Sequence, residues 1–315
     1  MENSIIFNHI HKYLNGKEIP KYNLDKSHVF YSIHSNLING ISIEDKISML
    51  YHFEEIKKIL SYSRNNKLHL AELKLKNLEK LNLQYSNKIA DIGITSIHLP
   101  MLAYVDYVKS DFNEAEKNLK NSIDLLYTLI HHGIEDCKIA CLEQYFNLFK
   151  VYVKLNNYEQ AAKIVFEIFL YITKNNSELI TYPFLNSIKD EIDCLHYYIN
   201  NILKVLLVKN KRDTIKLLET KLNIKHQLVL RLKKADLHSE YFSHLKSMLV
   251  FVLDENDNPN SFFSEFNIEN IISPDTPSFL QYLILEKYKN QNLENNTELS
   301  IIRKYYAEVL DMANY

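Results

Sequence analysis

Apolar side chains recur every three or four residues along most of the chain, the spacing of an amphipathic α-helix. The clearest stretch is Cys141–Tyr171, and its first half has an apolar face made of Tyr145, Leu148, Phe149, Tyr152 and Leu155. After a polar break at Asn156-Asn157, a second face follows, made of Tyr158, Ala161, Val165 and Ile168. Two amphipathic helices with so short a connection predict an antiparallel helical hairpin.

The same periodicity predicts helices on both sides of this hairpin. Before it, helices are expected at residues 4–14, 24–38, 42–62 and around 70–81. Ser42 and Asp45 form a capping box at the start of the third. After the hairpin, helices are expected at 186–209, 213–234, 236–253, 276–288 and 294–314, with an irregular, proline-containing stretch at 254–278.

Glycine is scarce, which restricts the fold class further. The 315 residues include 4 Gly and 6 Pro, whereas average usage would supply roughly 22 Gly. Sheets and doubly wound folds use turn glycines, so the sequence predicts an all-α protein. About thirteen helices with one apolar stripe each would pack as antiparallel pairs.

Two segments resemble tetratricopeptide repeats. The Cys141–Tyr171 hairpin has the family's pattern of aromatic, Leu and Tyr positions, a polar turn and then Ala161, although Phe149 stands where the family keeps Gly or Ala. A second, weaker copy covers Ser96–Leu126, with Ala103 at the small-residue position. The resemblance implies a right-handed α-solenoid. The turn-following Ala115 and Ala161 are 46 residues apart, whereas the family's repeat is roughly 34 residues long, so the solenoid would be irregular. The alternative is a compact helical bundle.

Three regions are expected within one continuous structural unit. Residues 1–95 form an N-terminal helical region, 96–235 the tetratricopeptide-like repeats, and 236–315 C-terminal helices with the acidic irregular loop at 254–278.

No window of the chain approaches eighteen apolar residues, so no membrane contact is expected. The first residues lack a secretory signal, and the three cysteines (Cys137, Cys141, Cys194) form no disulfide framework. We therefore expect a cytoplasmic protein, with Cys137 and Cys141 half-buried.

Candidate chemistry is sparse. The chain has no G-x-S-x-G, P-loop or G-x-G-x-x-G motif, so no catalytic residue and no cofactor are expected. Two acid–histidine pairs with helical spacing could bind metal on a helix face, namely Asp45 with His52 and Glu240 with His244. The seven-residue spacing of Asp45 and His52 also occurs at Glu2/His9, Asp124/His131 and Glu219/His226, so it is not a specific motif. An all-helical, metal-dependent enzyme of the di-iron type is kept as an alternative.

Charge is unevenly distributed although the net charge is only −2, which argues against nucleic acid as a partner. The segment from Lys204 to Lys234 holds ten Lys or Arg and two acids, whereas Ser247 to Glu286 holds seven acids and no Lys or Arg. The two segments could pair with each other, or the basic one could bind an acidic partner. The candidate basic surface comprises Lys209, Lys211, Arg212, Lys216, Arg231, Lys233 and Lys234.

The tetratricopeptide resemblance also implies a binding surface. In such repeats the first helix of each pair lines a concave groove, which would place Tyr104, Tyr107, Phe146, Lys150 and Lys154 on its wall. Aromatic rings and lysines there would suit an extended peptide. The expected function is a non-enzymatic peptide- or protein-binding scaffold, with a signal-peptide-sensing regulator of the tetratricopeptide type as an alternative. Homo-oligomerisation is left open.

Overall fold

The computed structural model describes residues 42–80, 85, 87–181, 188–208, 213–237, 239–256, 262, 271 and 276–292. Within this described part there are ten helices and no strand, which confirms the all-α class. None of these helices combines the length and apolarity needed to cross a membrane. The helices expected at 4–14, 24–38 and 294–314 lie outside the described residues.

The described residues form two compact units, and the division falls inside one helix, α8 (Tyr158–Ile172). We call them the N-terminal unit, up to Ile164, and the C-terminal unit, from Val165. This division does not coincide with the expected region limits at residues 95 and 235.

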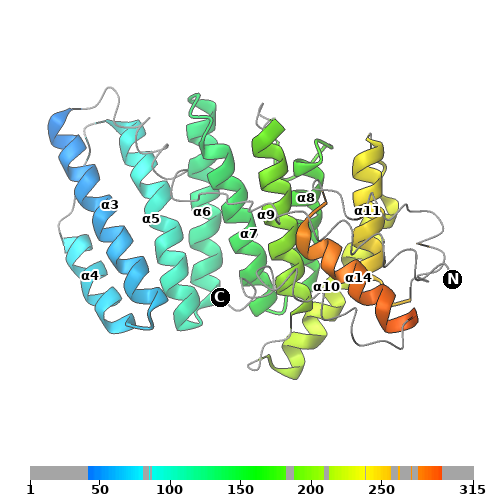
Figure 1. The fold of residues 1–315 in the computed structure, drawn as a ribbon. Coiled ribbons are helices and arrows are strands. Elements are labelled where there is room, and N and C mark those ends of the chain that lie inside the picture. Colours follow the sequence, from blue (N-terminus) through cyan, green and yellow to red (C-terminus); the bar gives the residue numbers. More distant parts are fainter. Residues whose placement is uncertain are drawn as a thin grey trace, which may run out of the picture. The chain divides into compact units, whose positions relative to one another are not determined.

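The N-terminal unit is a row of helices that stand side by side (Figure 1). Its full-length members are α3 (Ile43–Arg64), α4 (Leu68–Lys80), α5 (Lys88–Lys109), α6 (Phe112–His131) and α7 (Cys137–Lys154). Helix α3 packs against α4 and α5, and α6 packs between α5 and α7. Each helix therefore buries an apolar stripe against its neighbours along the chain.

Local capping explains where these helices begin and end. The Ser42 hydroxyl accepts a hydrogen bond from the Asp45 amide at 3.1 Å, which confirms the predicted start of α3. Gly133, with φ of 85°, follows the end of α6, as expected for a residue that tolerates the left-handed region. At the predicted break after α7, Asn156 has φ of 56° and the Asn157 amide donates to the Tyr152 carbonyl at 2.9 Å.

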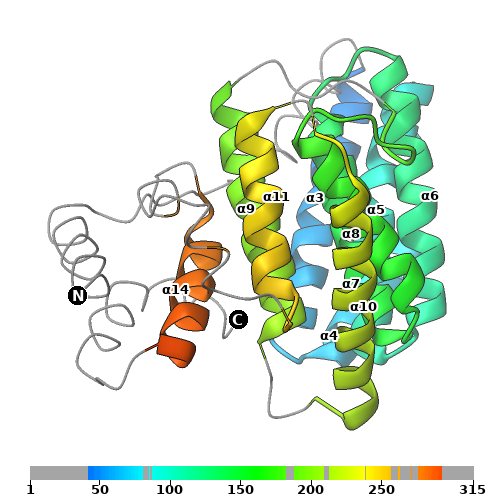
Figure 2. The ribbon, with the colours of Figure 1, turned by 90° about the vertical axis from the view of Figure 1, so that its right-hand side faces the viewer.

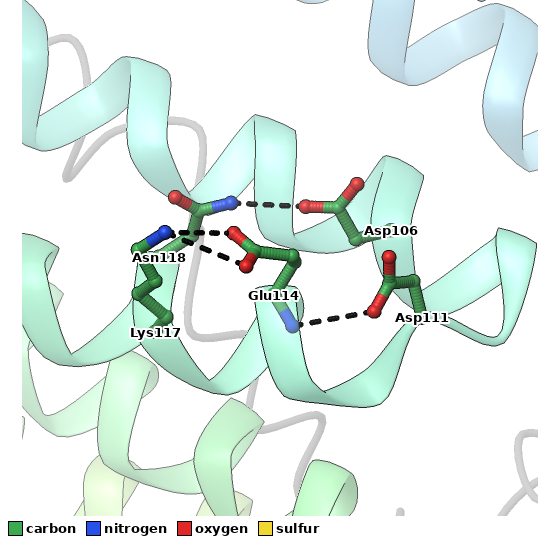
Figure 3. A network of polar contacts seen from close by, with 5 residues as sticks. All are labelled: Asp106, Asp111, Glu114, Lys117 and Asn118. Atoms are coloured by element: carbon green, nitrogen blue, oxygen red, sulfur yellow. Dashed lines mark hydrogen bonds and ion pairs between the residues drawn. The ribbon is translucent and has the colours of Figure 1, made fainter.

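A polar network surrounds the turn between α5 and α6 (Figure 3). Ser110 takes a left-handed conformation, and Asp111 accepts a hydrogen bond from the Glu114 amide at the start of α6. Asn118 of α6 donates to the Asp106 carboxylate of α5 at 2.9 Å, which ties the two helices together close to their connection. Burial raises the pKa of Asp106. Ser110 and Asp111 thus form the connection between the two helices.

Small and large side chains fill the interior of the N-terminal unit. The turn-following alanines Ala115 and Ala161 are both completely buried, and so is Phe149. The prediction that Cys137 and Cys141 are half-buried is wrong, because both side chains are fully buried. Helix α7 is buried on most of its sides. Neither cysteine forms a disulfide. Burial raises the pKa of the Cys137 thiol, so it is held as an uncharged apolar group.

The C-terminal unit contains α9 (Ile188–Leu207), α10 (Ile215–Lys234), α11 (Glu240–Leu253) and α14 (Ser278–Asn292), besides the second half of α8. Helix α10 packs against α9 and α11, and α14 packs against α9 and α11 (Figure 2). Its largest fully buried side chains are aromatic, namely Tyr198, Phe169, Phe251 and Phe279. Thr214 caps α10 by accepting a hydrogen bond from the Leu217 amide at 3.2 Å.

Candidate functional site

A hydrogen-bonded chain of three rings links α3 and α5 in the N-terminal unit. His52 of α3 bonds through Nδ1 to the Tyr85 hydroxyl at 3.1 Å and through Nε2 to Nδ1 of His98 at 2.8 Å. His98 lies on α5, and the two imidazoles meet edge to face with centroids 5.1 Å apart. All three side chains are half-buried, so their polar atoms are satisfied largely by one another.

The surroundings of this chain favour neutral imidazoles. Burial and, to a smaller extent, the neighbouring His98 together lower the pKa of His52 to about 4. Burial also lowers the pKa of His98. The pKa of Tyr85 is raised, first by burial and then by Asp91 and Asp45, so the phenol keeps its proton. The tautomer of the neutral His52 ring sets which partner donates in each of its two hydrogen bonds.

Acid is expected to weaken the α3–α5 contact. An unfolded His52 binds a proton near pH 6.5, whereas the folded one resists protonation until about pH 4. Stability from this shift is fully present above pH 6.5 and is lost as the pH falls from 6.5 towards 4, by about 1–2 kcal/mol after allowance for solvent screening of half-buried groups. Chemical denaturation of the full chain at a series of pH values measures this loss.

Two variants separate His52 from other groups that titrate in the same range. His52→Gln should lower stability at pH 7 and flatten its decline between pH 6.5 and 4. His69→Gln, at an exposed position of α4, should keep the wild-type pH dependence. Equal pH dependence in wild type and His52→Gln would show that the imidazole chain makes no contribution.

The candidate metal ligands do not gather into a larger set. Asp45 is almost fully buried, and both ring nitrogens of His52 are engaged with Tyr85 and His98. Glu240 and His244 lie on α11 with an oxygen–nitrogen distance of 3.9 Å, and Glu240 is strongly exposed. In the described residues, no three or more His, Cys, Asp or Glu side chains are placed to hold a metal ion. The metal-dependent alternative stays a prediction.

The predicted groove residues have different environments. Tyr104 has the Arg64 guanidinium of α3 5.9 Å from its ring centroid, and Tyr107 contacts Phe112 at the start of α6 with ring centroids 5.5 Å apart. Burial raises the pKa of Tyr107 to about 12. Phe146 is only 3% exposed, so its ring packs inside the unit and cannot line an open wall. Lys150 is half-buried and Lys154 is exposed.

Helix α7 reaches solvent along a single stripe. Its side chains are buried except for five that lie three or four residues apart: Ile139, Glu143, Asn147, Lys150 and Lys154. This spacing places them on one helix face. We call this set the α7 stripe. The Lys150 ammonium lies 4.5 Å from the Phe146 ring centroid, a cation–π contact that holds the lysine over a buried aromatic ring.

The basic segment pairs in part with the acidic one. Lys225 and Lys233 of α10 form ion pairs with Glu255 at 2.7 Å and with Asp254 at 2.8 Å. Lys287 of α14 donates to the backbone carbonyl oxygens of Phe251 and Asp254, close to the same place. In the basic surface set, Lys216, Lys233 and Lys234 are exposed and Arg231 is half-buried, whereas Lys209, Lys211 and Arg212 lie outside the described residues. Within the described part, internal pairing is therefore established.

Sequence reasoning missed His98 and Tyr85 as partners of His52. One signal was present: His52 and His98 are 46 residues apart, the same separation as Ala115 and Ala161. Equivalent positions on the first helices of successive hairpins lie close together in a repeat array. Under the expected repeat arrangement, the 46-residue separation of the two histidines was thus a signal for their contact. Tyr85 had no such signal.

Comparisons of the chain with family models, with curated proteins and with solved structures returned no match. A function therefore has to be argued from the α7 stripe, the hydrogen-bonded chain of His52, Tyr85 and His98, and the surface of α10.

Proposed function

We propose that the protein is a non-enzymatic scaffold that binds an extended peptide, or an extended segment of a partner protein, along the α7 stripe. The single observation that supports this is the confinement of solvent access on α7 to one row, which is polar except for Ile139. A helix buried on its other sides is rigid, so the row keeps its geometry when a ligand arrives. Rigid presentation lowers the entropic cost of binding.

The charges of the stripe suggest the direction and chemistry of the ligand. Glu143 lies towards the start of α7, while Lys150 and Lys154 lie one turn apart near its end. Lys154 is exposed, and Lys150 is steadied by the Phe146 ring. An acidic side chain or a terminal carboxylate at one end of the peptide would meet these two ammonium groups, while Asn147 offers hydrogen bonds to a peptide backbone.

This role agrees with the expected tetratricopeptide-like solenoid, in which first helices line the groove. The contact of α3 with α5 as well as with α4 supports this proposal. We propose this arrangement as an irregular solenoid, since α3, α5 and α6 are 20–22 residues long, α4 has 13 residues and α7 has 18. A regulator that senses a signal peptide would use the same surface.

Selection from a library of short randomised peptides on the immobilised full-length protein tests the proposal. Enriched peptides should carry an acidic residue or depend on their free carboxyl terminus. Lys150→Glu/Lys154→Glu should weaken their binding by at least about tenfold, because two attractive charge contacts become repulsive. Circular dichroism should show unchanged helicity, since neither side chain is in the core.

A matched control exists in the same unit. Lys76 and Lys80 of α4 have the same four-residue spacing and are both exposed. Lys76→Glu/Lys80→Glu makes the same change in net charge and should leave peptide affinity within about twofold of wild type. If both double variants lose affinity equally, the effect is one of overall charge; if neither does, the α7 stripe is not the binding surface.

A further inference from the structure

Helix α10 in the C-terminal unit exposes apolar side chains along one line. Ile215, Leu222 and Leu230 are 78%, 51% and 42% exposed. They follow one another after seven and eight residues, which is two helical turns in each case, so they share a face over roughly 22 Å of helix. The opposite face is also apolar, with Leu217, Ile224 and Leu228 buried among neighbouring helices. We call the exposed line the α10 stripe.

Such a stripe is unusual because a surface helix in a packed unit normally has one apolar face. The buried residues already satisfy the need of α10 for a core-facing side. Three large aliphatic side chains on the solvent side add nothing to that packing and expose apolar area to water. Large apolar residues that are exposed in a line along a helix are typical of a surface that another helix covers.

The charged neighbours of the stripe are mainly basic. Lys216 and Lys234 are exposed, one at each end of α10, and Glu219 is the exposed acid of this helix. Lys225 and Lys233 are already paired with Glu255 and Asp254. Apart from Glu219, the exposed charge that remains for a partner therefore lies at the two ends, next to Ile215 and Leu230, and it is positive.

Charge decides between the occupants that could cover the stripe. A second copy of α10 would bring lysines against lysines at the ends in a parallel or an antiparallel pairing, since Lys216 and Lys234 occupy both ends. A bilayer would need a broad apolar face, whereas this line is one residue wide and holds Glu219 between Ile215 and Leu222. An amphipathic helix with acidic residues beside its apolar row offers both a narrow apolar face and negative charge opposite the lysines.

We propose that the α10 stripe is a docking site for an amphipathic, acidic helix of a partner protein. The partner's apolar row packs against Ile215, Leu222 and Leu230, and its acidic residues near both ends pair with Lys216 and Lys234. This surface lies in the other unit from the α7 stripe and does not depend on the function proposed for it. A scaffold with both surfaces would join an extended peptide to a helical partner.

The test uses two synthetic helical peptides and fluorescence anisotropy with the full-length protein. Both peptides carry leucines every third and fourth residue; one is flanked by glutamates and the other by lysines. The glutamate peptide should bind, and at least about tenfold more tightly than the lysine peptide. Ile215→Ser/Leu222→Ser/Leu230→Ser should weaken this binding at least about tenfold, because the apolar row is lost.

A charge-swapped variant keeps the test independent of folding effects. Lys216→Glu/Lys234→Glu should bind the lysine peptide more tightly than the glutamate peptide, a reversal that misfolding cannot produce. The control variant Leu73→Ser changes an apolar residue of α4 that is 57% exposed, and it should bind the glutamate peptide as wild type does.

Three results would overturn the proposal. The first is the absence of any preference for the glutamate peptide in the wild-type protein. The second is co-sedimentation with phosphatidylserine vesicles that the triple serine variant abolishes, which would assign the stripe to a bilayer. The third is a concentration-dependent dimer that the same variant dissociates, which would assign it to a second copy of the chain.

Discussion

Phe149→Ala is expected to lower the free energy of unfolding by about 3–5 kcal/mol. The Phe149 ring is completely buried in α7, so its removal leaves a cavity that a helix with buried neighbours on most sides cannot close. Urea denaturation of the full chain, followed by circular dichroism, measures the loss. Phe149→Leu keeps most of the volume and should cost less than about 1.5 kcal/mol.

This variant also tests how the hairpin departs from a regular tetratricopeptide repeat. Phe149 stands where that family keeps Gly or Ala, a position at which two helices approach closely. If the backbones met there, Phe149→Ala would relieve crowding and leave stability unchanged or increase it. Tyr158→Ala, at a side chain that is 43% exposed, is the control and should change stability by less than about 1 kcal/mol.

Asp213→Ala is expected to be comparably destabilising, by about 3–5 kcal/mol. Asp213 and Lys221 form a 2.8 Å ion pair whose side chains are 7% and 8% exposed, and the Lys221 ammonium also donates to the Val208 carbonyl at 3.0 Å. Removing the carboxylate leaves a buried ammonium without its counter-charge. The midpoint of urea denaturation should fall accordingly.

Two further variants identify the buried charge as the cause. Asp213→Ala combined with Lys221→Met removes both charges and should recover a large part of the loss. Lys225→Ala breaks a pair in the same helix whose acid, Glu255, is 71% exposed, and should cost less than about 1 kcal/mol. If Asp213→Ala costs no more than Lys225→Ala, the buried pair does not stabilise the C-terminal unit.

Local features of the fold could be predicted because their causes lie within a few residues. The Ser42 cap and the polar break at Asn156-Asn157 each depend on a few side chains and their immediate backbone. The presence of a helix is likewise a local property, because it was predicted from the periodicity of apolar residues within the helix itself. The complete burial of Cys137 and Cys141 could not be predicted in this way, since it depends on which helices pack around α7.

The candidate sites depend on contacts between distant residues, so the sequence predicted them only in part. Lys150 and Lys154 were assigned from a family pattern, and the same pattern placed Phe146 on a wall although it is buried. The pairing of Lys225 and Lys233 with the acidic segment was one of two open alternatives, because charge counts do not specify partners. The α10 stripe was not predicted, because the charge counts described the segment from Lys204 to Lys234 only as basic.

Lysine footprinting tests the central claim, that the α7 stripe is the binding surface, most directly. Amine acetylation rates are measured by mass spectrometry in the free protein and with a saturating amount of a peptide obtained by selection. The account predicts slower acetylation of Lys150 and Lys154 in the complex and unchanged rates at Lys76 and Lys80. Unchanged rates at Lys150 and Lys154, with the peptide bound, would contradict it.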